Sequence, residues 1–234
     1  ETVYAYTWYS GTVQIESRTT TWPAVPSSQN GSGSASSRVE WLDAYGRAIW
    51  LKEERGYLTR WAYDDASGAV SQRIEDVDTS QTTDEPSGWA TPSGGGLHLV
   101  SDYEFDDLGR TTQELGPSHS VDIAGTATTI RRARWWVYQD NTHEQWDSLG
   151  YATGTAPNYT YKLWNPVRVQ KLDRAGRVKE EIRAVRYNLN GKLTASDSFG
   201  QSSYVRWQKF NYDNQGRLTY QRVYHLIPSS GEGS

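Results

Sequence analysis

Repeated aspartates are the residues of this sequence that come closest to a catalytic pattern. Paired carboxylates at a defined separation are the machinery of glycoside hydrolysis. Four aspartates stand three residues before a Gly-Arg pair, and three pairs of adjacent acids add further carboxylates: Asp43, Asp106, Asp173 and Asp213, with Glu53–Glu54, Asp64–Asp65 and Asp106–Asp107. However, adjacent residues of a strand point to opposite faces, so adjacent carboxylates need not converge. Because turn capping also explains the repeated aspartates, we expect no catalytic residue and no enzymatic activity.

Metal-ligating patterns are weak in this chain. The acidic stretch from Glu75 to Glu85 offers oxygen ligands of the kind that Ca²⁺ takes, but it lacks the spacing of an EF-hand, and a solvated loop explains it equally well. The absence of cysteine excludes a thiolate zinc site. The four histidines are scattered, without a His-Glu-x-x-His spacing: His98, His119, His143 and His225. We therefore predict no cofactor and no metal centre, and leave Ca²⁺ at the acidic stretch open.

Aromatic residues make the best case for ligand binding. Trp135, Trp136, Trp146 and Trp164 lie in one aromatic-rich region of the chain. Aromatic rings offer a large apolar face beside polar groups, which suits a sugar ring. The alternative is that alternate aromatics pack in the core and as cross-strand pairs, with Trp135 and Trp136 on opposite faces of a strand. These four tryptophans are our candidate glycan-binding residues.

Composition excludes several other classes of protein. The 234 residues include 24 basic and 28 acidic side chains, so the net charge of −4 argues against a nucleic-acid partner. No apolar run approaches the 18 residues of a membrane-spanning segment, and we expect no membrane insertion. The 11 Trp, 16 Tyr and 3 Phe indicate a chain that folds, because disordered chains contain few aromatics. A first residue other than methionine indicates a segment excised or processed from a longer protein.

A degenerate repeat organises the chain. Asp-x-x-Gly-Arg occurs four times, at residues 43–47, 106–110, 173–177 and 213–217. A type I turn favours Asp at its first position and Gly at its fourth, and glycine at that point supplies the left-handed backbone of a bulge that closes a hairpin. We expect the aspartates named above to cap these turns. Two further sets of residues are assigned by the repeat: Gly46, Gly109, Gly176 and Gly216 to the turn geometry, and Arg47, Arg110, Arg177 and Arg217 to ion pairs with neighbouring carboxylates across strands.

Strand-like segments flank the turns. Short runs rich in Thr, Val, Tyr and Trp alternate with Gly, Asn, Asp and Ser clusters, and no long segment has helical periodicity. Less complete copies of the turn are expected at Tyr63–Val70 and Tyr187–Leu193. We predict an all-β fold of consecutive antiparallel β-hairpins that form a curved repeat sheet. The chain is expected to be one segment, residues 1–234, with loop insertions near 27–37, 76–96 and 116–129.

The motif resembles a known repeat. Tyr212-Asp213-Asn214-Gln215-Gly216-Arg217 is similar to the YD repeat of bacterial RHS-repeat proteins and teneurins, and Asp197–Tyr204 resembles the other half of that repeat. The overall texture also resembles very large secreted RHS-type proteins of planctomycete-like bacteria. The resemblance implies a β-sheet ribbon that winds, in complete family members, into a hollow shell. This chain has only a handful of repeats and lacks the Asp-Pro-x-Gly motif at which family members release their cargo.

The function expected from these observations is structural. The chain is predicted to be a scaffold segment of a large RHS/YD-repeat protein, secreted or at the cell surface, with a carbohydrate-binding module as the alternative. The expected partners are neighbouring repeats of the same polypeptide, a second copy joined edge to edge through unpaired strands, and a glycan.

Overall fold

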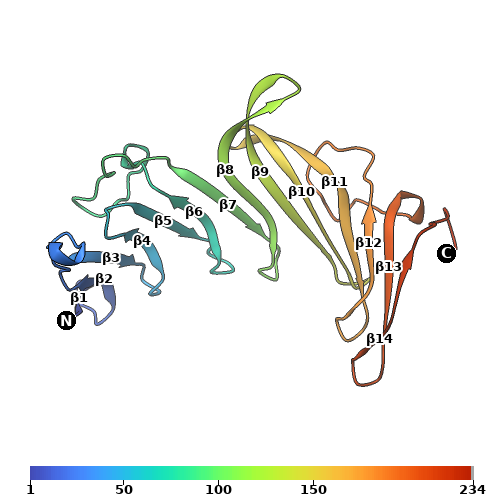
Figure 1. Ribbon diagram of the computed structural model, residues 1–234, viewed down its shortest axis with the longest axis horizontal. Helices are drawn as coiled ribbons and strands as arrows, with labels where there is room; N and C mark the ends of the chain where they lie inside the picture. Colours follow the sequence, from blue (N-terminus) through green and yellow to red (C-terminus); the bar gives the residue numbers. More distant parts are fainter. Residues whose placement is uncertain (233–234) are drawn as a thin grey trace. The chain divides into compact units, whose positions relative to one another are not determined.

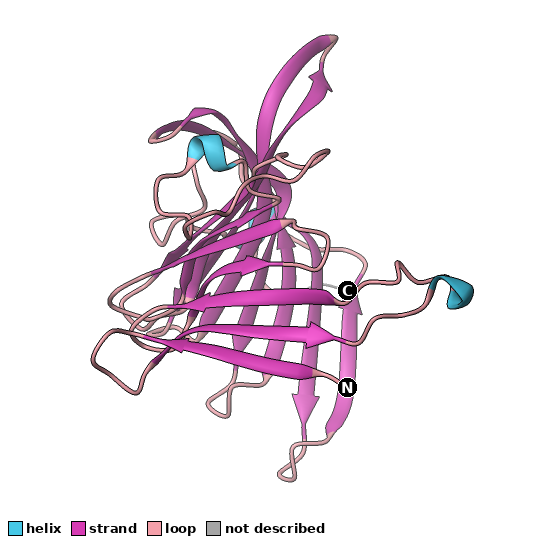
Figure 2. Ribbon diagram, turned by 90° about the vertical axis from the view of Figure 1, so that its left-hand side faces the viewer, coloured by secondary structure: helices cyan, strands magenta, loops and turns pink. Residues whose placement is uncertain are grey.

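The computed structural model describes residues 1–232, and it is built almost entirely of β-strands (Figures 1 and 2). These residues form fourteen strands in a sheet whose order follows the chain from β1 to β14. Every pairing for which a register is defined is antiparallel, so consecutive strands are joined as hairpins. The predicted all-β fold of consecutive antiparallel hairpins is confirmed.

The chain divides into two compact units, Glu1–Asp102 and Tyr103–Ser234, which are described separately. The strands of the first unit are β1 (Val3–Trp8), β2 (Ile15–Trp22), β3 (Ser36–Leu42), β4 (Ala48–Lys52), β5 (Leu58–Tyr63) and β6 (Val70–Glu75). β7 (Leu99–Phe105) contains the boundary. The strands of the second unit are β8 (Thr111–Ile123), β9 (Thr126–Gln139), β10 (Glu144–Thr155), β11 (Asn158–Leu172), β12 (Val178–Ala184), β13 (Tyr204–Tyr212) and β14 (Leu218–Tyr224).

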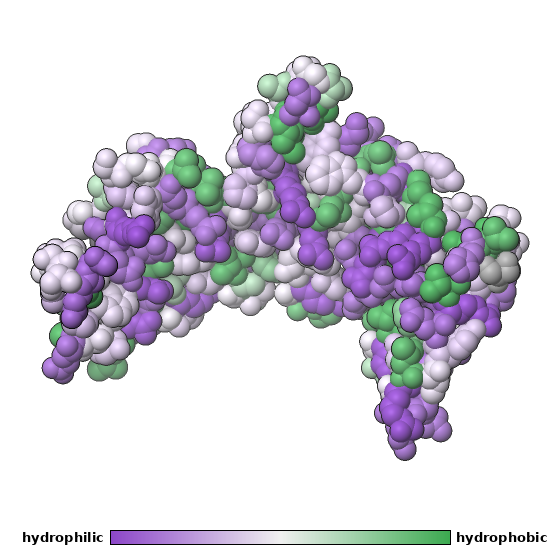
Figure 3. All heavy atoms as spheres, viewed as in Figure 1, coloured by the Kyte–Doolittle hydropathy of each residue, from purple (hydrophilic) through white to green (hydrophobic). Residues whose placement is uncertain are grey.

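Helix is confined to three single turns of 3₁₀ helix among the described residues. They are η1 (Ser27–Gln29), η2 (Thr79–Gln81) and η3 (Gln201–Ser203), all in connections between strands. Within residues 1–232, no helix has both the length and the apolar character that crossing a membrane requires. The outer surface seen in Figure 3 is mostly hydrophilic or neutral, with hydrophobic atoms in small separate patches.

The core of the first unit lies between one face of its sheet and a connecting segment. Trp50, Leu58 and Ile74 point from β4, β5 and β6 into this core, where each is at least 95% buried. The connection between β6 and β7 covers them with Val77 and Trp89. The Trp89 ring meets the Trp50 ring edge to face, with centroids 6.3 Å apart. This connection, residues 76–98, is named the first covering segment.

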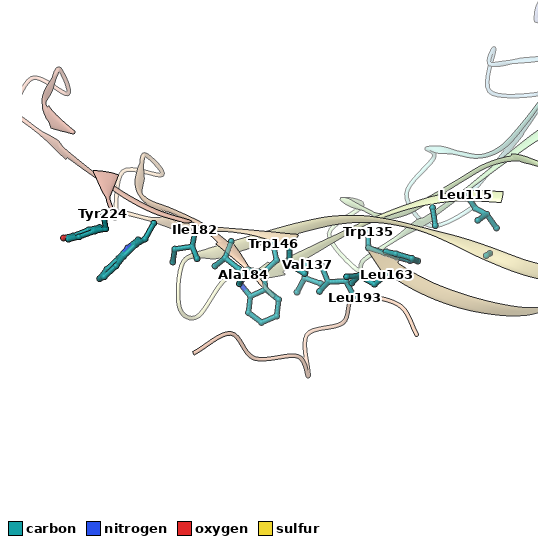
Figure 4. Packing of buried hydrophobic residues seen from close by; sticks show 14 residues of the cluster. Leu115, Trp135, Val137, Trp146, Leu163, Ile182, Ala184, Leu193 and Tyr224 are labelled. Atoms are coloured by element: carbon teal, nitrogen blue, oxygen red, sulfur yellow. The ribbon is translucent and has the colours of Figure 1, made fainter. Parts of the chain in front are cut away.

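The second unit repeats this arrangement on a larger scale (Figure 4). Along β9, β10 and β11, alternate residues are buried on one face of the sheet, as expected when only one face meets the core. The connection between β12 and β13, residues 185–203, runs over this face and contributes Leu193 and Phe199. It is named the second covering segment. The strand residues of this core include Trp135, Val137, Trp146, Leu163, Ile182 and Trp207.

Two of the three predicted loop insertions are confirmed, and one is wrong. Residues 27–35 lie in the connection between β2 and β3, although Ser36 and Ser37 already belong to β3, and residues 76–96 lie in the connection between β6 and β7. Residues 116–129 instead form the outer part of the β8–β9 hairpin, which turns at Ala124–Gly125. Gly116 and Pro117, which open this segment, lie in a bulge where the register shifts between Leu115 and Ser118, so neither breaks the strand.

Candidate functional site

The four Asp-x-x-Gly-Arg turns share one geometry, seen here at residues 173–177. The backbone N–H of Asp173 donates to the carbonyl of Arg177 at 2.8 Å, and the N–H of Gly176 donates back to the carbonyl of Asp173 at 3.0 Å. Gly176 has φ of +78°, in the left-handed region that favours glycine. The same two hydrogen bonds and a positive φ recur in the turns that start at residues 43, 106 and 213. The glycine assignments are therefore confirmed.

The aspartate side chain caps each turn from within. Asp173 Oδ1 accepts from the backbone N–H groups of Ala175 and Arg177, both at 2.9 Å. Its Oδ2 accepts from Nε of Arg177 at 2.7 Å. Identical sets of bonds hold the other three aspartates, so the predicted capping role is confirmed. All acceptor oxygens are thus engaged inside the turn, which explains the recurrence of aspartate without any chemistry.

These hydrogen bonds also shift the titration of the carboxyls. The bond from the Arg177 backbone N–H, helped by its guanidinium, lowers the pKa of Asp173 below its ordinary value although burial opposes this. For Asp43 and Asp106 burial is the largest influence and raises the pKa, yet the bonds from the arginine four residues later outweigh it, so each pKa is lowered. The carboxyls are thereby kept ionised, which is opposite to the raised pKa of a general acid.

The prediction for the arginines is wrong at three of four positions. Arg47, Arg177 and Arg217 pair with the aspartate of their own turn at 2.7 Å, and not with a carboxylate on a neighbouring strand. Arg110 makes the same contact with Asp106 and also reaches Asp140 beyond β9, where two bonds of 2.8 Å form a bidentate pair. Aspartate and arginine four residues apart face each other across the turn, which places the guanidinium within reach of the turn's own carboxylate.

In three of these turns, the arginine contacts a tyrosine of a following strand, a different tyrosine in each case. The Arg47 guanidinium lies over the Tyr63 ring, 4.2 Å from the ring centroid, and the Tyr63 hydroxyl donates to the carbonyl of Ala48 at 2.7 Å. Tyr212 makes the same two contacts with Arg177 and Val178, at 4.7 Å and 2.9 Å. We call this pair of contacts the tyrosine clamp.

The third clamp joins Tyr138 to Arg110 and to the carbonyl of Thr111, at 4.2 Å and 3.2 Å. In each case the tyrosine belongs to the strand that follows the turn's outgoing strand, so the clamp joins β4 to β5, β8 to β9 or β12 to β13. Arg217 makes no cation–π contact within residues 1–232, and its side chain is 73% exposed, against 36% for Arg177. Sequence reasoning missed the clamps, because each tyrosine is separated along the chain from the turn that it contacts.

Several less complete copies of the motif have different outcomes. The copy at Asp64–Gly68 is a turn that is one residue longer, capped through Ser67. The copy at Tyr187–Leu193 is wrong as a hairpin, because it lies in the second covering segment. Two turns were missed because their residue types differ: Glu53–Gly56 has glutamate in the first position, and Asp140–His143 has His143 at a φ of +55° where glycine was expected.

The remaining polar candidates are engaged in local structure. Asp76 accepts from the N–H groups of Gly96 and Leu97, and Asp78 accepts from the N–H and the hydroxyl of Ser80, so the acidic stretch braces the first covering segment. Within residues 1–232, no group of three or more His, Asp or Glu side chains is placed to hold a metal ion.

The four candidate tryptophans are split between the two faces of the second sheet. Trp135 and Trp136 point to opposite faces, as predicted, with Trp135 99% buried. Trp146 is buried too, with its ring edge to face against Phe199, so the expectation of a ligand-facing ring is wrong for Trp135 and Trp146. Both belong to the core to which the second covering segment contributes Leu193 and Phe199. Trp136 is half-buried beneath the Arg134 guanidinium, and Trp164 is 44% exposed.

Trp164 lies in a groove on the face of the sheet away from the core. The outer part of the β8–β9 hairpin forms one side of the groove, and β10 and β11 form its floor. Its volume is about 600 Å³, and its lining includes Val121, Ile130, Arg132, Tyr151, Lys162 and Trp164. We call it the aromatic groove. Sequence reasoning identified Trp164 but missed the other residues: Val121 lay in the segment assigned to a loop, and the rest are brought together only by the pairing of β9, β10 and β11.

Comparisons with known proteins add no relative. The sequence matches no protein-family model, and no curated protein sequence is significantly similar to it.

Proposed function

We propose that this chain is a structural segment of a β-sheet wall in a large secreted or cell-surface protein of the RHS/YD-repeat type, and that it carries out no catalysis. The tyrosine clamp is the observation that supports the proposal. Three times, an Asp-x-x-Gly-Arg turn is capped internally and then tied to the next strand by a ring and a hydroxyl. In such a unit, the charged and aromatic residues connect neighbouring hairpins.

The strands at the two ends of the sheet support the proposed partners. Within residues 1–232, β1 pairs only with β2 and β14 only with β13, and all six residues of β1 are exposed. An exposed strand edge presents unpaired N–H and carbonyl groups, which pair readily with another strand. We propose that these edges meet neighbouring repeats of the same polypeptide or a second copy of the chain. Light scattering that shows a strict monomer at high concentration would contradict the second of these.

Limited proteolysis tests the structural role of the clamp. Tyr212→Phe removes the hydroxyl that holds Val178 and keeps the ring, so local opening around Arg177 should become easier by about 1 kcal/mol. If cleavage requires that opening, trypsin should cut after Arg177 roughly fivefold faster than in the unaltered protein. Tyr187→Phe is the matched control, because Tyr187 is 83% exposed and is not one of the three clamp tyrosines. Equal cleavage rates after Arg177 in all three proteins would refute the proposal that the clamp stabilises the turn against local opening.

Carbohydrate binding is the second candidate function, and one observation favours it. Trp164 and Tyr151 lie 5.9 Å apart between ring centroids on the floor of the aromatic groove, with Trp164 44% exposed. A pair of neighbouring rings at an open surface is the arrangement that stacks against a sugar. Titration with neutral and acidic oligosaccharides tests this function, and the absence of any binding would exclude it.

A further inference from the structure

We propose that the aromatic groove binds an acidic saccharide, with sugar rings on Trp164 and Tyr151 and carboxylates at Arg132 and Lys162. This inference rests on the carbohydrate-binding function proposed above and adds the charge of the ligand. Four features carry it: the register of the strands, the unpaired cations, the open rings and the size of the groove.

The register places the two cations on either side of a ring. Arg132 of β9 lies directly opposite Tyr151 of β10, and Tyr151 lies directly opposite Lys162 of β11. Directly paired residues project from the same face of a sheet. Adjacent strands are about 4.8 Å apart, so the two cationic residues are separated by roughly 10 Å at the backbone. That span is comparable to one or two sugar units, with the tyrosine between them.

The two cations have no partner in the described part of the chain, which distinguishes them from their neighbours on the same face. Within residues 1–232, neither Arg132 nor Lys162 forms an ion pair or a cation–π contact. By contrast, Arg168 pairs with Asp147 at 3.5 Å and with Glu181 at 3.0 Å. The acidic residue nearest the hairpin turn, Asp122, accepts from the Gly125 N–H at 2.7 Å. Among the described residues, Asp122 is the one carboxylate in the groove lining, so the two cationic side chains of Arg132 and Lys162 leave an excess of positive charge there.

The rings and the walls favour a saccharide over other anions. The Trp164 and Tyr151 planes are tilted by 46°, so they form a continuous but angled aromatic floor. The β8–β9 hairpin adds the apolar side chains of Val121 and Ile130. A volume of about 600 Å³ falls in the range of small-molecule sites. A uronic acid combines the apolar ring face that stacks on aromatics with a carboxylate that arginine binds through two parallel hydrogen bonds.

Calorimetric titration of the whole 234-residue chain tests the proposal. The probe is a trisaccharide of galacturonic acid, and the neutral comparison is a trisaccharide of galactose. We expect the acidic trisaccharide to bind at least tenfold more tightly than the neutral one. The double variant Arg132→Gln, Lys162→Gln should remove most of this preference. Trp164→Ala should weaken both ligands. Arg206→Gln, an exposed arginine on the same face but outside the groove, should change neither.

Each outcome has a definite consequence. Equal binding of the two trisaccharides would overturn the charge preference and leave carbohydrate binding in place, whereas no binding of either would overturn both. A loss with Arg206→Gln as large as with the groove double variant would show non-specific attraction and overturn the site. A triglutamate peptide that binds as tightly as the acidic trisaccharide would overturn the choice of ligand. Should Trp164→Ala fail to fold, the glutamine variants, which keep the aromatic floor, decide the question.

Discussion

The left-handed glycine of the turn gives a prediction that isolates a single physical cause. Gly176 has φ of +78°, and a β-carbon built on it meets no atom within 4 Å. Gly176→Ala therefore adds no steric clash, and its whole cost is the left-handed backbone, about 1–2 kcal/mol. For a chain of this length, that cost lowers the melting temperature by about 2–8 °C. The hydrogen bonds of the turn should survive, because alanine keeps the backbone N–H.

Two companion substitutions separate this cause from others. Gly200 has φ of −76°, and its β-carbon would approach only the Ser202 hydroxyl, at 4.0 Å. Gly200→Ala should therefore be neutral or slightly stabilising, because it reduces the freedom of the unfolded chain. Gly176→Asn should cost less than Gly176→Ala, because asparagine tolerates the left-handed region. Urea unfolding followed by tryptophan fluorescence measures all three variants. If Gly176→Ala were as stable as Gly200→Ala, the turn geometry assigned to the repeat would be refuted.

Three further predictions concern packing, acid and charge. Gly150→Ala should be more destabilising than Gly176→Ala, because its β-carbon would lie 2.2 Å from the carbonyl oxygen of Lys162; a melting temperature close to that of Gly176→Ala would contradict this. The pKa of each turn aspartate is lowered by folding, so the stability it adds is present above the unfolded pKa of about 4 and lost as pH falls through the folded pKa. Urea midpoints measured from pH 6 to pH 2 should fall in that window, and a flat profile would contradict it. Arg110→Gln, which loses two aspartate partners, should lower the urea midpoint more than Arg217→Gln, whose side chain is 73% exposed, and equal effects would argue against the pair with Asp140.

The turns were predictable because every atom that defines them lies within five consecutive residues. An aspartate, a glycine three residues later and an arginine after it are enough to specify the two backbone bonds, the cap and the ion pair. The tyrosine clamp was not predictable in this way. Its ring and hydroxyl come from the next hairpin, and the number of residues between Arg47 and Tyr63 differs from that between Arg177 and Tyr212. Only the pairing of strands brings these residues together.

The aromatic groove was hidden for a related reason. The interpretation of residues 116–129 as a loop insertion, which begins with Gly116 and Pro117, removed the outer part of the β8–β9 hairpin from the sheet. The structure accommodates both residues in a bulge, so the strand continues beyond them and forms a wall of the groove. The alternation of side chains along a strand correctly placed Trp135 and Trp136 on opposite faces, but it did not indicate which face of the sheet another segment would cover. That choice depends on the second covering segment, whose sequence had been interpreted as further copies of the repeat.

The two covering segments follow from a constraint that any single-layered sheet faces. One face of such a sheet can exclude water only if another part of the chain covers it. In the first unit, Trp89 meets Trp50 edge to face at an angle of 82°, and in the second, Phe199 meets Trp146 at 86°. Both segments are irregular connections that were expected to be loops or extra repeats, yet each delivers an aromatic ring to the same kind of contact. Their apolar residues are therefore part of the core, and the acidic residues around Val77, which is fully buried, serve to fold that connection back onto the sheet.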